Sequence, residues 1–326
     1  MNRKDFLLLA EDIVNNRLPD DETYKEILRH DNGITGILNG ADLIREHYFG
    51  RSIHLCTICN GKSGRCSEDC RFCSQSAFYK TDAPVYPIQG KDELIKGGLH
   101  ASGTPVNRYS IVTTGRGLPS GEVAAVAEAM SELDGLKIGR CASLGILNRE
   151  DLLTLKKAGV NRYHHNLESS KGYFPKVCTT HTYKERVDTI LTAKDLGMEV
   201  CAGGIFGIGE KDEHILELAL DLRELDVDSI PINFLISIKG TPLESIHNLT
   251  PMKCLKIIAL FRYVHPNKEI IICGGREQNL GDLQPMIFYA GASAIMTGNY
   301  LTREGRTLDR DLEMIRTLGF NTREKP

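Results

Sequence analysis

Three cysteines, Cys66, Cys70 and Cys73, stand close together in the segment CSEDCRFC with the spacing C-x3-C-x2-C. Three thiolates on one short loop can hold a four-iron, four-sulfide cluster and leave its fourth iron without a protein ligand. Such an open iron can bind a small molecule and pass it an electron. A structural zinc site is the alternative, but zinc needs a fourth ligand and this spacing is unusual for it. The pattern therefore favours a redox-active iron–sulfur centre.

The composition indicates what kind of protein carries this loop. Of the 326 residues, 41% are hydrophobic and 25% are charged, which is typical of a globular protein with a sizeable core. The net charge of −3 gives no basic surface for nucleic acid or for anionic membranes. No segment has the roughly 18 consecutive apolar residues that span a bilayer, and the start, MNRKDFLLLAEDIVNN, is typical of an amphipathic helix rather than a signal peptide. We expect a cytoplasmic protein, with no nucleic-acid or membrane partner, whose clustered cysteines bind metal.

Hydrophobic periodicity predicts the elements that position the loop. Eight apolar, β-branched runs are typical of strands, at 52–59, 107–114, 137–144, 161–168, 199–207, 229–236, 269–275 and 293–298. Amphipathic helical segments lie between them, at 123–133, 150–159, 183–197, 213–225 and 251–264. Eight such units predict an α/β fold, a (β/α)8 TIM-type barrel, and a doubly wound open sheet is the alternative.

The same pattern predicts the domain organisation. We expect a single domain over residues 1–326, with an N-terminal helical cap over 1–50, and the barrel and a C-terminal extension over 51–326. The cysteine loop then follows the first strand, at the mouth of the barrel where the active-site groups of such folds lie.

The segment CSEDCRFCSQS (66–76) resembles the radical S-adenosylmethionine superfamily, and its last residues, Ser-Gln-Ser, are similar to those of the biotin synthase family. The likeness extends over roughly residues 40 to 320. Further matching segments are YHHNLE (163–168), TTHTYKERVDT (179–189), CAGGIFGIGE (201–210), VDSIPINFLISIKGTPL (227–243) and GGREQ (274–278). No single one of these later segments is decisive, but their order along one chain is a specific pattern.

The resemblance implies a set of cofactor-binding residues. Cys66, Cys70 and Cys73 would hold a 4Fe–4S cluster whose open iron binds the amino and carboxylate groups of S-adenosylmethionine. One electron from the cluster would then cleave the cofactor to methionine and a 5′-deoxyadenosyl radical. The resemblance places four further residues at the cofactor: Phe72 along the adenine, Glu168 at the ribose, Arg186 at the carboxylate, and Ile205 within GGIFGIGE (203–210).

Two asparagines are the expected substrate-binding residues. By the resemblance, Asn166 bridges cofactor and substrate, and Asn233 reads the ureido ring of dethiobiotin with its amide donor and acceptor. Asn166 and Glu168 lie two residues apart in the expected strand 161–168, so we expect both side chains to point the same way.

The chain departs from the family at a second, auxiliary cluster, which commonly has cysteines on the second, third and fifth strands and an arginine on the seventh. Cys141 and Cys201 are present, but Ser110 and Ile271 occupy the other two positions. The auxiliary cluster is then either absent or built differently. At the position of Cys56 the family usually has a serine that lines the barrel, so the resemblance implies that Cys56 faces inward, and by period two Cys59 then does not. Cys56 would join Cys141 and Cys201 in one layer of alternate strands. Three thiolates favour a four-iron cluster with an extra, non-protein sulfide that is donated to the substrate.

Four cysteines remain outside these two sets. Cys273 is the first reserve ligand of the auxiliary cluster, with Cys59 behind it. Cys178 is expected in a loop near the mouth of the barrel, where it either contributes to the auxiliary cluster, lines the substrate space or is merely buried. Cys254 is expected on a helix that faces the core. The sequence leaves the nuclearity and the full ligand set of the auxiliary cluster open.

The expected function is that of a biotin synthase, a radical S-adenosylmethionine sulfurtransferase that inserts sulfur into dethiobiotin after hydrogen abstraction. The resemblance implies a reducing partner such as flavodoxin or ferredoxin, and a homodimer; the sequence itself fixes neither. One alternative is a related barrel enzyme of the hydrogenase-maturation or methylornithine-synthase type, in which the auxiliary cluster has no role. Another is a cysteine-rich zinc or redox-sensing binding protein, which a colourless, zinc-loaded preparation would reveal.

Overall fold

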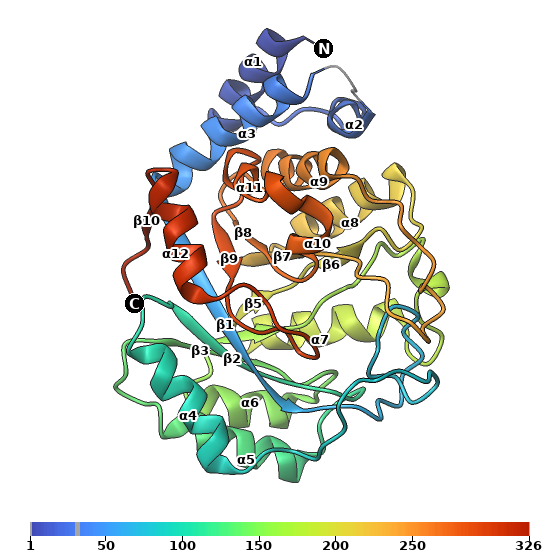
Figure 1. Ribbon diagram of the computed structural model, residues 1–326, viewed down its shortest axis with the longest axis vertical. Helices are drawn as coiled ribbons and strands as arrows, with labels where there is room; N and C mark the ends of the chain where they lie inside the picture. Colours follow the sequence, from blue (N-terminus) through green and yellow to red (C-terminus); the bar gives the residue numbers. More distant parts are fainter. Residues whose placement is uncertain (1, 30–32, 326) are drawn as a thin grey trace.

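Parallel strands form a closed barrel in the computed structural model, which describes residues 2–29 and 33–325 (Figure 1). The strand β1 pairs with β2 on one side and with β9 on the other, which closes the barrel. The barrel strands are β1 Ser52–Lys62, β2 Arg108–Thr113, β3 Gly139–Ser143, β4 Arg162–His164, β5 Glu199–Cys201, β6 Gly204–Phe206, β7 Ser229–Phe234, β8 Glu269–Ile272 and β9 Ala294–Met296. This closure confirms the (β/α)8 barrel and excludes the open sheet.

The fifth barrel position is shared by two short strands. The sequence predicted one strand over 199–207, but β5 ends at Cys201 and β6 begins at Gly204, and both pair with β7 in the same register. At the break, Gly203 packs so closely on β7 that a Cβ atom there would lie 2.0 Å from the carbonyl oxygen of Pro231. Glycine permits this approach because it has no side chain.

Helices follow the strands and cover the outside of the barrel. Each of the five helical segments expected from the sequence is present, with ends shifted by no more than a few residues. The helices are α4 Lys91–Ser102, α5 Ser120–Ser131, α6 Arg149–Lys157, α7 Tyr183–Asp195, α8 Asp212–Glu224, α9 Pro251–Val264, α10 Arg276–Leu280, α11 Met286–Tyr289 and α12 Leu308–Thr317. Short 3₁₀ turns lie at Phe174–Lys176 and Gly281–Leu283. No described helix is long and apolar enough to cross a membrane.

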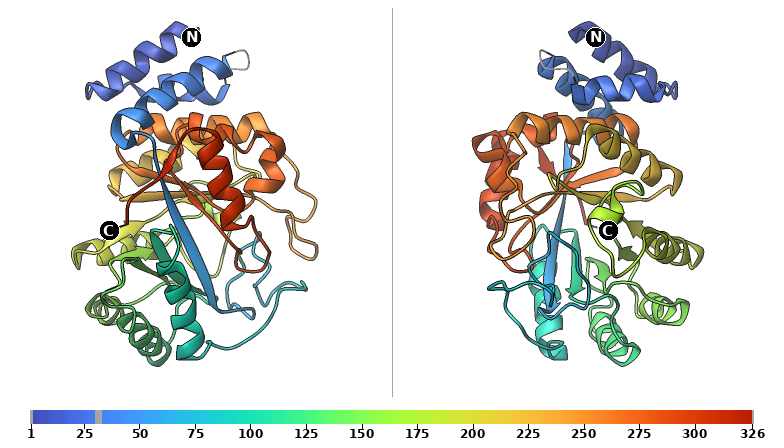
Figure 2. Two further views of the ribbon diagram at one scale, coloured as in Figure 1. Left: turned by 60° about the vertical axis from the view of Figure 1, so that its left-hand side comes forward. Right: turned by 90° about the vertical axis from the view of Figure 1, so that its right-hand side faces the viewer.

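Three N-terminal helices, α1 Arg3–Val14, α2 Asp21–Arg29 and α3 Ile34–Phe49, form the expected cap at one end of the molecule (Figures 1 and 2). They pack on α9, which explains why every residue from Cys254 to Val264 is buried although α9 lies outside the barrel. The strand β1 starts next to the cap and runs to the opposite end (Figure 1). The cysteine loop after β1 is therefore remote from the cap. A last strand, β10 Asn321–Thr322, pairs with the start of β1.

Candidate active site

A cavity of about 340 Å³ lies inside the barrel, between the strands, the cysteine loop and the segment that precedes α12. Most of the predicted site residues line it: Cys56, Phe72, Cys73, Cys141, Asn166, Glu168, Cys201, Ile205 and Asn233. Cys66, Cys70 and Arg186 are not part of its lining: the two cysteines belong to the cysteine loop beside it, and Arg186 belongs to α7. Residues predicted for the cofactor, the substrate and the auxiliary cluster thus line one cavity or lie directly beside it.

The cysteine loop folds back on itself beyond the end of β1. The N–H of Cys66 donates to the carbonyl of Gln75 at 2.8 Å, and the N–H of Ala77 donates to the carbonyl of Cys66 at 2.8 Å. A third backbone bond, of 3.0 Å, joins the N–H of Cys73 to the carbonyl of Cys70. Burial raises the pKa of the Cys73 thiol to about 11. Iron binding has to displace that proton, because only the thiolate is a ligand.

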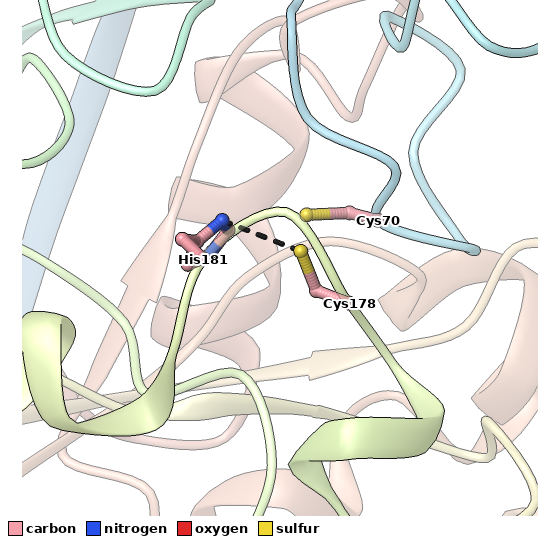
Figure 3. Close-up of side chains that lie close together, drawn as sticks. All are labelled: Cys70, Cys178 and His181. Carbon is pink, nitrogen blue, oxygen red and sulfur yellow. Dashed lines mark hydrogen bonds between the residues drawn. The ribbon is translucent and has the colours of Figure 1, made fainter.

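The Cys70 side chain lies against Cys178 and His181, which come from the segment before α7 (Figure 3). One ligand atom of each of the three lies within 4.8 Å of the other two, as in a metal site. However, Arg186 Nε donates a hydrogen bond of 2.9 Å to His181 Nε2. Arginine is always a donor, so the imidazole proton belongs on Nδ1, facing the carboxylate of Glu68. In this arrangement His181 is a hydrogen-bond donor rather than a metal ligand.

The two acidic residues inside the CxxxC segment hold the cysteine loop on this same segment. Asp69 Oδ1 accepts the N–H of Thr179 at 2.8 Å and the N–H of Thr180 at 3.3 Å. Glu68 Oε2 accepts the hydroxyl of Thr180 at 2.8 Å. Burial would raise the pKa of Asp69, but the hydrogen bonds from Thr179 hold it well below its usual range. Asp69 therefore stays ionised and keeps the two loops together.

Asn166 and Glu168 both line the cavity, but the reason given from the sequence was wrong. β4 ends at His164, and Glu168 has a left-handed φ of 67°, which a strand cannot accommodate. The N–H of Glu168 donates to the carbonyl of Gly203 at 3.2 Å, and Asn166 Oδ1 accepts the N–H of Gly203 at 3.1 Å. The break after β5 therefore positions both side chains, and strand alternation does not.

Arg186, at the start of α7, completes this corner of the site. Its Nη1 donates to the carbonyl of Asn166 at 2.8 Å and lies 3.8 Å from Glu168 Oε1. Burial raises the pKa of Glu168, and the nearby Arg186 opposes that rise. A mostly buried cation and a mostly buried carboxyl group are thus held side by side. Such a pair can bind a zwitterionic ligand with hydroxyl groups.

Asn233, on β7, is fixed from both sides by backbone groups. Its Nδ2 donates to the carbonyl of Gly204 at 3.3 Å, and its Oδ1 accepts the N–H of Gly274 at 3.0 Å. A side-chain amide has two N–H donors and two lone pairs. One donor and one acceptor site therefore remain for a ligand in the cavity. Phe72 and Ile205 also line the cavity and belong to one apolar group beside it.

Three further cysteines, Cys56 on β1, Cys141 on β3 and Cys201 on β5, converge on the cavity, as the sequence predicted. Burial raises the pKa of Cys56 well above its usual value and that of Cys201 to about 12. Ser110 stands beside Cys141 in the sheet register, and among the described residues its buried hydroxyl has no hydrogen-bond partner. Buried polar groups are normally paired. Three such thiols and a free hydroxyl around one space fit an iron–sulfur cluster.

The remaining cysteines differ in whether they line the cavity or pack in the core. Cys273 lines the same cavity and packs with Cys201 and Ile271. Cys59 packs instead against the outer core of the barrel, and Cys254 is fully buried on α9. Cys273 is thus the reserve residue that lies nearest to the three converging cysteines.

Two arginines that the sequence did not point to, the mostly buried Arg108 and the buried Arg162, lie beside these cysteines. Arg108 Nη1 is 3.8 Å from Cys141 Sγ, and Arg108 Nη2 is 2.7 Å from Glu199. Arg162 bridges Glu199 at 2.8 Å and Glu269 at 2.7 Å. Both arginines line the cavity. Their guanidinium groups bring positive charge to the place where anionic thiolates and sulfide would gather.

His164 is a third lining residue that we did not select. Its Nδ1 lies 3.3 Å from Cys201 Sγ. Burial, together with the nearby Arg186 and Arg162, lowers the pKa of His164 to about 4. The imidazole is therefore neutral at pH 7 and offers one hydrogen bond to the Cys201 sulfur.

Glu269 is the centre of this buried charge network, and its replacement by glutamine is expected to destabilise the protein by about 3 kcal/mol at pH 7. Burial would raise the pKa of Glu269, but His54 and Arg162 outweigh it and hold that pKa well below its usual value. This stabilisation is present above the unfolded-state pKa of about 4.3 and is lost as the pH falls below it toward the folded-state pKa.

Urea unfolding of the cluster-free protein at pH 7 and pH 3.5 measures this effect. The difference in the free energy of unfolding between wild type and Glu269→Gln should be smaller at pH 3.5 than at pH 7. Glu132→Gln is the control, because Glu132 pairs with Lys91 on the surface and should change stability little at either pH. An equal difference at both pH values would contradict the network's role.

Comparison with known proteins assigns the family. The model of the Radical SAM superfamily matches residues 60–222, and that of the Biotin and Thiamin Synthesis associated domain matches residues 231–321. A curated biotin synthase from Desulfatibacillum aliphaticivorans is 52% identical over 98% of this chain and 98% of its own. The chain belongs to the biotin synthase family.

Other biotin synthases support the same assignment. The protein from Geobacter sulfurreducens is 44% identical over 94% of each chain. As a biotin synthase family member with a radical SAM domain, the chain is an enzyme, a sulfurtransferase that uses a 4Fe–4S cluster and S-adenosylmethionine. An auxiliary iron–sulfur cluster is typical of this family.

Solved structures show the same fold. Methylornithine synthase superimposes with a TM-score of 0.85 over 97% of each chain at 18% identity. A maturase of the [FeFe]-hydrogenase superimposes with a TM-score of 0.81, covering 98% of this chain and 75% of its own, at 14% identity. At these identities the likeness concerns the fold alone. The alternative functions of these two types are not favoured, because the curated relatives of high identity are biotin synthases.

Proposed function

We propose that this chain converts dethiobiotin to biotin, with a radical-generating cluster at the mouth of the barrel and a sulfur-donating cluster inside it. The observation that supports this proposal most is the convergence of Cys56, Cys141 and Cys201 on the cavity that also holds Asn166 and Asn233. A sulfur source and a group that can recognise a urea ring would thus share one cavity.

At the mouth, Cys66, Cys70 and Cys73 are the proposed ligands of the 4Fe–4S cluster. Their donor atoms are three sulfurs on one short, internally hydrogen-bonded loop, which fits such a cluster. When bound, the cluster would supply the electron for radical chemistry with S-adenosylmethionine. The loop's contribution is to hold three thiolates and leave one side open toward the cavity.

Four residues are the proposed cofactor contacts. Arg186 pairs with the cofactor carboxylate, a task for which its planar fork is suited. Glu168 accepts hydrogen bonds from the ribose hydroxyls, since its carboxylate is buried beside that arginine. Phe72 and Ile205 provide the apolar wall along the adenine. Together these four residues would hold the cofactor at the mouth of the barrel.

Two asparagines are the proposed substrate contacts. Asn233 offers its remaining N–H and lone pair to the ureido ring, and Asn166 stands between the cofactor residues and the substrate. The cavity wall between polar groups is apolar, with Ile58, Val112 and Met296 among its residues. Such a wall excludes water, which protects a radical from side reactions.

Cys56, Cys141 and Cys201 are the proposed ligands of the auxiliary cluster, with Cys273 in reserve. A four-iron cluster with one extra sulfide fits this set, because three thiols leave one iron free and Arg108 and Arg162 add positive charge beside them. When bound, this cluster supplies the sulfur atom. The protein's part is to keep the sulfide source within reach of the substrate carbon atoms.

We also propose the wider setting of the enzyme. A small electron carrier such as flavodoxin or ferredoxin would reduce the cluster at the mouth, and two copies would form a homodimer. All ten cysteines are free thiols, which suits the reducing cytoplasm. Residues 1–326 would act as a single domain, because α2 and α3 of the cap pack on α9 of the barrel.

Anaerobic turnover with dethiobiotin, S-adenosylmethionine and a chemical reductant tests the reaction. The proposal predicts biotin together with 5′-deoxyadenosine. Formation of 5′-deoxyadenosine from another substrate, with no biotin from dethiobiotin, would refute it.

Replacing Asn233 by alanine is expected to lower kcat/KM for dethiobiotin about 30-fold, because about 2 kcal/mol of hydrogen bonding is lost. The measurement is steady-state biotin formation. Asn279→Ala is the matched control, since Asn279 is anchored to the carbonyls of Leu235 and Gly275 but does not line the cavity. Equal losses in the two variants would show that Asn233 acts only on the fold.

A further inference from the structure

The sulfur of Cys178 lies directly against that of Cys70, a proposed cluster ligand (Figure 3). Both side chains are buried, and their sulfur atoms lie within 4.8 Å of each other. Among the described residues, neither Cys66 nor Cys73 belongs to the group of close ligand atoms that Cys70 forms with Cys178 and His181. Cys178 is thus the cysteine grouped with Cys70.

The backbone around this pair is held independently of any metal. Asp69, next to Cys70, accepts hydrogen bonds from the N–H groups of Thr179 and Thr180, which follow Cys178. In the other direction, the N–H of Arg71 donates to the carbonyl of Val177 at 3.0 Å. Residues on both sides of each cysteine are therefore tied together. Loss of a cluster from Cys70 would leave its sulfur facing Cys178.

We propose that Cys178 is the disulfide partner of Cys70 when the mouth cluster is destroyed by oxidation. A peroxide oxidises the Cys178 thiol to a sulfenic acid and releases one water. The Cys70 thiol then attacks that sulfur and a disulfide forms. The hydroxyl group leaves together with the proton of the Cys70 thiol, as a second water. Two thiols and one hydrogen peroxide thus become one disulfide and two waters. The bond keeps Cys70 in a form that a thiol reductant restores, whereas sulfinic and sulfonic acids are not restored.

Peptide mapping of cluster-free full-length protein after exposure to hydrogen peroxide tests this inference. Trypsin releases residues 66–71, CSEDCR, and residues 177–184, VCTTHTYK. The inference predicts that these two peptides are joined without reductant and separate after reduction. The joined species should persist in Cys66→Ser and vanish in Cys70→Ser and in Cys178→Ser. Cys254, fully buried on α9, should stay a free thiol in the same digest.

A second measurement tests whether the disulfide with Cys178 protects Cys70 from overoxidation. After peroxide and then reductant, Cys178→Ser should carry several-fold more sulfinic and sulfonic acid on Cys70 than wild type. Both Cys178→Ser and Cys178→Ala are examined, and circular dichroism verifies that each folds. Two outcomes would overturn the inference: Cys70 joined to Cys66 or Cys73 while Cys178 stays free, or equal Cys70 overoxidation in wild type and variant.

The inference uses the proposed role of Cys70 as a cluster ligand, but its test does not depend on that role. The disulfide is measured in metal-free protein. The proposed function fails instead if Cys66→Ala retains all the iron that wild-type protein binds.

Discussion

Replacing Cys66 by alanine is expected to lower 5′-deoxyadenosine formation by more than about a thousandfold, because two thiolates do not hold a four-iron cluster with an open iron. Biotin formation should fall equally, since the substrate cannot react without the radical. The measurement is the amount of 5′-deoxyadenosine formed per chain under anaerobic conditions with excess reductant.

Cys254→Ala is the matched control for this experiment. It also removes one buried thiol, but from α9, outside the cavity. Its product yield per folded chain should be close to that of wild type. If Cys66→Ala keeps a substantial part of the activity, the cluster at the mouth is held by other residues, and Cys178 beside Cys70 would be the first to examine.

Replacing Cys201 by alanine is expected to separate the two activities of the enzyme. Cys201 lies in the cavity and not on the cysteine loop, so the cluster at the mouth should form and S-adenosylmethionine should still be cleaved. Biotin formation should fall by more than about a hundredfold, because the sulfur source has lost one of three ligands. The measurement is the ratio of biotin to 5′-deoxyadenosine in a single turnover.

Cys141→Ala should behave in the same way as Cys201→Ala, and Cys59→Ala should not. Cys59 is on β1, three residues from Cys56, but packs against the outer core. It therefore controls for the loss of a thiol from the same strand. A normal ratio of biotin to 5′-deoxyadenosine in Cys201→Ala would mean that the donated sulfur does not come from this site.

The barrel and the mouth cysteines followed from local patterns in the sequence. Strand and helix periodicities gave the eight barrel positions, and the short spacing of Cys66, Cys70 and Cys73 required no tertiary information. Period two also separated Cys56 from Cys59, because a continuous strand such as β1 turns alternate residues to opposite faces. The periodicities and the cysteine spacing involve only residues that are close to one another along the chain, so the sequence alone reveals them.

The remaining parts of the site depend on contacts that no local pattern encodes. The position of Glu168 follows from a left-handed residue and from Gly203 on the next strand. Arg162 and Glu269 pair across 107 residues, and nothing near either one specifies the other. A signal was available for Arg108 and Arg162, since each lies two residues before an inward-facing position, Ser110 and His164. Alternation along the two strands would have selected them.

Iron and sulfide analysis after anaerobic reconstitution tests most directly whether the chain carries two clusters, one at the mouth and one built on Cys56, Cys141 and Cys201. The account predicts about eight irons per chain in wild-type protein, with somewhat more sulfide than iron. In Cys66→Ala, about four irons should remain, and these should be lost when Cys141 and Cys201 are also replaced. Only about four irons in wild-type protein, all lost in Cys66→Ala, would contradict the account.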